Sequence, residues 1–60
     1  MKTLNARERT LYLAGILSAC GSLTIMEAVE EILSGLHGRE YRLSDEEKTE
    51  YEITLTAMVG

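Results

Sequence analysis

LYLAGILSACGSLTIMEAVEEILSGL, residues 11–36, is the stretch that decides the fold of this 60-residue chain. Its first half has apolar residues at i, i+3, i+4 and i+7, the spacing of one helix face: Leu13, Ile16, Leu17 and Cys20. Its second half carries another helical stripe, formed by Ile25, Val29, Ile32, Leu33 and Leu36. We therefore predict helices at about residues 6–20 and 25–37, joined by a short loop into an αα-hairpin.

Start and stop signals give the bounds of these helices. A capping residue followed three positions later by glutamate occurs three times: Asn5 with Glu8, Thr24 with Glu27, and Ser44 with Glu47. The cap side chain accepts from a backbone N–H at the helix start, and the glutamate accepts from the N–H of the cap residue. Gly21 is expected to end the first helix, and Gly35 or Gly38 the second.

The last third of the chain fits two structures. Ser44 begins a stretch of good helix formers, which predicts a third helix at about residues 45–58. Residues 51–57 also alternate strictly between apolar and polar, which is strand periodicity, and the alternative is an α+β fold with a C-terminal strand. We favour the helix, with Ile53 pointing outward, because such a strand has only residues 40–43 to pair with.

A chain of this size needs support from outside its own core. It forms a single domain, 1–60, and one cysteine with one histidine provides neither an internal disulfide nor a zinc site. We therefore expect an all-α homodimer built around helix 6–20. Its core would pack Leu13, Ile16, Leu17 and Cys20 against Ile25, Val29, Ile32 and Leu36. The surplus apolar surface around Leu11 and Gly15 would be the dimer seam, and a charge at Leu17 would prevent folding.

No residue pattern indicates catalysis, a cofactor or a metal. Cys20 completes an apolar helix face, and nothing in the sequence brings it to His37 as a nucleophile to its base. The three acids of helix 25–37 fit a solvated face that stays in water or meets a basic partner: Glu27, Glu30 and Glu31. We therefore expect a non-enzymatic protein.

Binding to nucleic acid is disfavoured by charge. The chain has 6 Lys+Arg against 10 Asp+Glu, a formal net charge of −4, and a pI of about 4.8. A small DNA-binding regulator would use the basic N-terminus, with Arg7 and Arg9 on phosphate. Residues 14–36 loosely fit a helix-turn-helix, but the helix that would read the groove carries only acids, which phosphate repels.

One short motif points instead to attachment to a membrane. Residues 17–20, Leu-Ser-Ala-Cys, resemble a bacterial lipobox, and a bacterial lipoprotein is thus a second alternative. Against it, the preceding apolar run is short and Glu8 is unusual in the basic start of a signal peptide. Residues 10–26 carry no charge, but seventeen residues are few for a membrane span, and two helices joined at Gly21 explain them better.

The chain, which opens Met1-Lys2-Thr3-Leu4-Asn5-Ala6-Arg7-Glu8, is very short, acidic and helical. In these features it resembles the small reading-frame products of lambdoid bacteriophages, in particular those encoded between the exonuclease and excisionase genes. The resemblance implies an early phage protein in the host cytoplasm. It would influence the choice between lysis and lysogeny by binding host or phage proteins. No motif allows functional residues to be transferred position by position.

Overall fold

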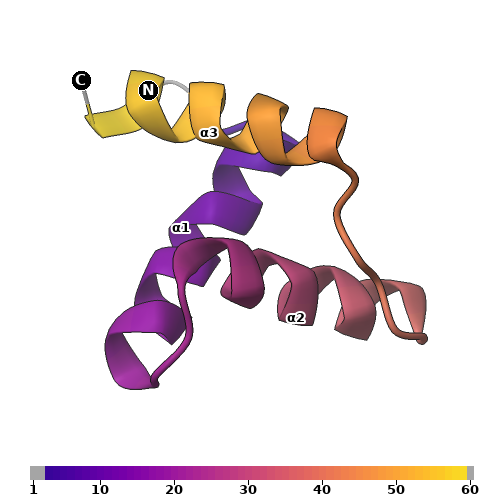
Figure 1. The fold of residues 1–60 in the computed structure, drawn as a ribbon. Helices are drawn as coiled ribbons and strands as arrows, with labels where there is room; N and C mark the ends of the chain where they lie inside the picture. Colours follow the sequence, from indigo (N-terminus) through magenta and orange to yellow (C-terminus); the bar gives the residue numbers. More distant parts are fainter. Residues whose placement is uncertain (1–2, 60) are drawn as a thin grey trace.

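The computed structural model describes residues 3–59, which form three α-helices, α1 (Ala6–Cys20), α2 (Ile25–His37) and α3 (Asp45–Val59) (Figure 1). The all-α prediction is confirmed, and every helix begins and ends within one residue of its predicted bounds. Residues 51–57, where a strand was the alternative, are helical, and the described part of the chain contains no strand. Ile53 points outward as expected and is 65% exposed.

All three predicted capping boxes are present. The side chain of Asn5 accepts from the Glu8 N–H at 2.8 Å, and Glu8 accepts from the Asn5 N–H at 2.9 Å. The same reciprocal pair joins Thr24 to Glu27, at 3.2 and 2.8 Å. At the start of α3 it joins Ser44 to Glu47, at 3.2 and 3.0 Å. Each box satisfies backbone donors that the first turn of a helix leaves free, so local sequence sets where each helix begins.

Glycines cap the C-terminal ends of α1 and α2. Gly21 caps α1, and the chain turns by 116° between α1 and α2, so the hairpin is open. Gly38 caps α2 in the left-handed region, with φ of 68°, and its N–H donates to the carbonyl of Ser34. Gly35 lies inside α2, which settles the choice between the two predicted stops.

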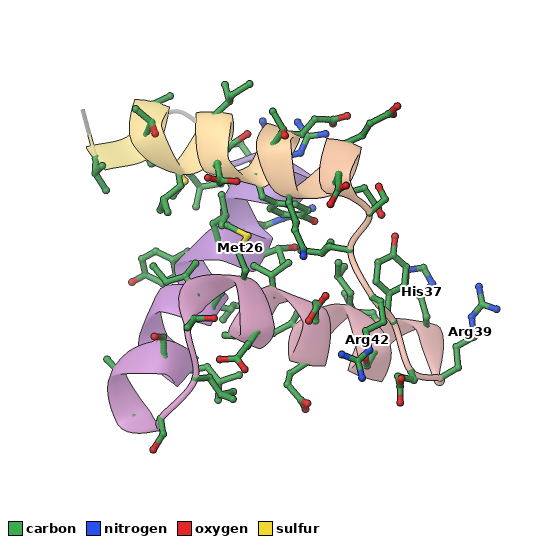
Figure 2. All side chains as sticks on the ribbon, viewed as in Figure 1. Met26, His37, Arg39 and Arg42 are labelled. Carbon is green, nitrogen blue, oxygen red and sulfur yellow. The ribbon has the colours of Figure 1, made fainter. Side chains whose placement is uncertain are left out.

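The core is small. It contains five buried apolar residues from α1, α2 and the connector before α3: Leu11, Ala14, Ala28, Val29 and Leu43. Val29 is the largest side chain that is completely buried. The fully buried alanines on α1 and α2 leave room for the two backbones to approach closely. Met26 also packs against this core and points from α2 toward α3 (Figure 2).

Helix α3 lies on the outside of this core. It runs back in the opposite sense to α2 and crosses the first turns of α1 (Figure 1). None of its residues is fully buried, and Tyr51 and Leu55 are half-buried against the core. Arg7 of α1 pairs with Glu50, and its guanidinium carbon lies 5.7 Å from the centre of the Tyr51 ring. A cation over an aromatic face and an ion pair thus hold α3 onto α1.

The predicted packing face of α1 is wrong. Within one chain α1 turns Thr10, Leu11 and Ala14 inward. The face predicted to pack on α2 is exposed instead: Leu13 by 52%, Ile16 by 50%, Leu17 by 38%, and Cys20. The error has a physical cause. α1 is apolar nearly all round, so its periodicity does not single out one face, and the small residues take the closest contact.

Two further packing predictions need correction. Leu11 is only 2% exposed, so it belongs to the core of one chain and cannot form a dimer seam with half-buried Gly15. Leu36, predicted in the core, is 75% exposed because it lies in the last turn of α2, at the edge of the contact with α1 rather than within it. Val29 is buried as predicted, and Ile25 and Ile32 are half-buried against the core.

Candidate functional site

The main surface feature of the molecule is an exposed row of apolar side chains along α1. We call Leu13, Ile16, Leu17 and Cys20 the apolar strip; all four are exposed. Residues three and four apart lie next to each other on a helix, so the strip is continuous over two turns. Tyr12, 59% exposed, borders it one turn before Ile16. Because contiguous exposed apolar surface is typical of interaction sites, the strip is the candidate site on this molecule.

A groove extends the apolar strip onto α2. Its volume is about 310 Å³, and it is lined by Ala6, Arg9, Thr10, Leu13, Ile32 and Leu36. Leu13 belongs to both features and therefore joins them. Leu36 forms the far wall of the groove and exposes most of its side chain to water. The exposed apolar surface thus spans two helices rather than one.

The apolar strip has no charge of its own. The sequence carries no Asp, Glu, Lys or Arg from Thr10 to Met26. Arg9 stands at the N-terminal border of the strip, and the last turn of α1 contains no basic residue. Recognition at this surface would therefore depend on shape and apolarity, and within residues 3–59 Arg9 is a cation at its edge.

The acids predicted to face water or a basic partner have different roles. Glu27 caps α2, and the hydrogen bonds from Thr24 lower the pKa of its carboxyl group. Glu30, predicted to be solvated, is half-buried and accepts from the Leu43 N–H at 2.9 Å. Glu27 and Glu31 are exposed, and Glu31 takes no part in capping a helix. A pocket between α2 and the connector brings these three together with Glu40. Among residues 3–59 no group of His, Cys, Asp or Glu is arranged to hold a metal ion.

The two N-terminal arginines proposed for phosphate contact are placed differently. Arg7 is engaged within the chain by Glu50 and Tyr51, as described above. Arg9 is exposed beside the groove. The 116° turn and the four residues between α1 and α2 match the dimensions of a helix-turn-helix. The second helix of that unit presents Glu27 and Glu31 to solvent, where DNA would bring phosphates.

Sequence reasoning missed the role of Tyr41 in the connector. Its N–H donates to Ser34 Oγ at 2.9 Å, and its hydroxyl donates to Glu47. Its ring stacks on His37 with centroids 4.9 Å apart. The Glu47 hydrogen bond raises the pKa of Tyr41 and lowers the pKa of Glu47. Figure 2 shows His37 beside this connector, together with Arg39 and Arg42. Tyr41 therefore ties the end of α2 to the start of α3.

The structure does not bring the remaining motif residues together. Cys20 ends α1 and His37 ends α2, so the length of α2, about 20 Å, lies between them. The Leu17–Cys20 segment that resembles a lipobox forms the last turn of α1. No single helix within residues 3–59 is long and apolar enough to cross a membrane, although α1 and α2 taken as one bent pair reach that threshold.

Comparison with known proteins finds no matching family model. It also finds no similar curated protein and no similar solved structure.

Proposed function

We propose that this chain is a non-enzymatic interaction module that acts by binding protein through the apolar strip of α1. The observation that carries the proposal is the exposure of Leu13, Ile16 and Leu17 in a chain whose buried core is small. Water disfavours exposed apolar side chains, and burying a fully exposed large one contributes about 1.5–3 kcal/mol. Leu13, Ile16 and Leu17 are 38–52% exposed, so a protein partner that covers the strip gains roughly half of that from each.

The shape of the surface supports a protein partner over other ligands. The apolar strip lies on a convex helix and is flanked by an open groove, whereas sites for small molecules are concave and enclose most of the ligand. Exposed helix faces with i, i+3, i+4 and i+7 anchors are a recurring means of protein recognition.

The proposed setting follows the resemblance to small phage products. We propose an early phage regulator in the host cytoplasm that acts by contact with host or phage proteins and influences the choice between lysis and lysogeny. Although α1 and α2 have the dimensions of a helix-turn-helix, charge opposes DNA binding, since Arg7 is engaged by Glu50 and the exposed face of α2 is acidic.

Site-specific photo-crosslinking in bacterial cells tests this proposal. A benzophenone amino acid replaces Leu13 in one variant and Ile53 in a control variant. Ile53 is equally apolar and is 65% exposed, but it lies on α3. The proposal predicts discrete protein adducts from position 13 that are absent from position 53. No adduct from position 13, or the same adducts from both positions, would contradict it.

A further inference from the structure

We infer that the apolar strip is covered by a second copy of this chain, with the two α1 helices packed antiparallel across a two-fold axis. This inference rests on the proposed function, because it names the partner of the same surface. It also relocates the dimer seam from Leu11, which is buried in the core of one chain, and half-buried Gly15 to the opposite side of α1.

The exposed area is the first argument. The chain has an accessible surface of 4544 Å². A folded monomer of 6.7 kDa is expected to expose about 3,900 Å². The excess of roughly 600 Å² approaches the surface of about 800 Å² that each partner buries in a stable protein interface. The excess is comparable to the area that one helix-sized contact per chain would bury.

The size of the core favours a copy of the chain over an unrelated protein. Only three large apolar side chains among the described residues are buried, namely Leu11, Val29 and Leu43. A chain of this length buries about 60% of its unfolded surface and is marginally stable by itself. A second copy is present wherever the first is made, so it can cover the apolar side chains that this small core leaves exposed.

Spacing and charge set the orientation. A two-fold axis between Ile16 and Leu17 places Ile16 of one chain opposite Leu17 of the other. The same axis brings Leu13 of one chain next to Cys20 of the other. The uncharged strip then meets an uncharged strip, so the net charge of −4 on each chain does not oppose contact at the seam. Antiparallel packing also moves Arg9 toward the C-terminal end of the second α1. That end carries a partial negative charge and has no basic residue of its own.

A parallel pair lacks these advantages. It would align the two helix dipoles in the same direction and bring Arg9 next to the same arginine of the second chain. An isologous antiparallel contact closes on itself and leaves no free apolar strip for further growth, so a dimer is the end point.

Sedimentation equilibrium of the full-length chain over a concentration series tests the inference. We expect twice the chain mass of 6.7 kDa for the wild type and for the control Ile53→Glu. Ile16→Glu is expected to give the single mass, because it places two carboxylates at the centre of the seam. A single mass for the wild type at all concentrations would overturn the second copy as partner. A doubled mass for Ile16→Glu would overturn the apolar strip as its seam.

Disulfide trapping tests the orientation without depending on the stability of a charged variant. In the antiparallel pair the two Cys20 residues are separated by about 10 Å along the helix axis, the rise of seven residues. Oxidised glutathione should therefore cross-link Leu13→Cys, through its new thiol and native Cys20, but not the wild type. Failure of Leu13→Cys to cross-link, or efficient cross-linking of the wild type, would overturn the antiparallel arrangement.

These outcomes separate this inference from the proposed function. A monomeric wild type that still gives position-specific adducts with another protein in cells would remove the second copy but keep the interaction module. Absence of any adduct from position 13 would remove both.

Discussion

The carboxylate of Glu30 on α2 accepts a hydrogen bond from the backbone N–H of Leu43, 2.9 Å away and 13 residues later in the chain. Leu43 is 6% exposed and is the one buried residue that the connector contributes to the core. Glu30 therefore provides a hydrogen-bond acceptor for a backbone N–H that lies outside any helix. The bond holds the connector in place, and the side chain of Leu43 packs into the core.

Glu30→Ala should lower the free energy of unfolding by about 1–3 kcal/mol, because the N–H of a buried residue loses its acceptor. Glu31→Ala, one residue along on the exposed side, should change it by less than about 0.5 kcal/mol. Urea unfolding followed by circular dichroism measures both. Equal effects of the two substitutions would mean that the Glu30 bond contributes nothing specific.

The contact between Tyr41 and Glu47 should make stability depend on pH at both ends of the scale. Its hydrogen bond lowers the pKa of Glu47 below its ordinary 4.5, so this stabilisation is complete above that value and is lost as pH falls through the folded pKa. The pKa of Tyr41 is raised above 10.0, so its share is complete below 10.0 and is lost as pH rises through the folded pKa.

Tyr41→Phe removes the hydroxyl and keeps the ring that stacks on His37. Its thermal midpoint should fall relative to the wild type at neutral pH, and the difference should shrink at the acid and alkaline limits. Melting curves across pH measure this. A difference that is constant with pH would show that the hydrogen bond to Glu47 is not the cause.

Gly35 inside α2 and Gly38 at its C-terminal cap should respond in opposite directions to the same substitution. Gly38→Ala should destabilise the fold by about 1–2 kcal/mol, because φ of 68° is left-handed and strained for alanine. Gly35→Ala should stabilise it by up to about 1 kcal/mol, because the residue lies inside the helix and an added Cβ meets no atom within 4 Å. Thermal melts of the two variants measure the pair. The same sign for both would contradict the helix end at Gly38.

A charged side chain introduced on the buried side of α1 should prevent folding, whereas one introduced on the exposed side should prevent association only. Leu11→Asp should unfold the chain, since a buried unpaired charge costs several kcal/mol against a total stability near 5 kcal/mol. Leu17→Asp should keep native helicity and lose the partner, because Leu17 is 38% exposed in the single chain. The sequence pattern, by contrast, predicts that a charge at position 17 prevents folding. Circular dichroism together with sedimentation distinguishes the two results.

Local signals in the sequence were sufficient for the helices. Each capping box involves residues three apart, so its hydrogen bonds can be predicted without knowledge of the fold, and all three are present. The choice of helix for residues 51–57 was also correct, because a strand would have lacked a partner to pair with.

The way in which the helices pack could be predicted less well from the sequence. α1 has apolar residues on every side, and which side turns inward depends on how closely Ala14 and Ala28 allow the helices to approach. The bonds of Glu30 to Leu43 and of Arg7 to Glu50 join residues far apart in sequence. No local pattern predicts such pairs. The same holds for the candidate site. The spacing of Leu13, Ile16, Leu17 and Cys20 predicts that they share one helix face, but only the structure shows that this face is exposed.

Isotope-filtered NMR can show whether the apolar strip of α1 forms a seam between two chains. Labelled and unlabelled chains are mixed, and only contacts between different copies give cross-peaks. We predict intermolecular cross-peaks between the methyl groups of Ile16 and Leu17, and none from the methyl groups of Leu11. Intermolecular cross-peaks from Leu11, or none from Ile16 and Leu17, would contradict the account.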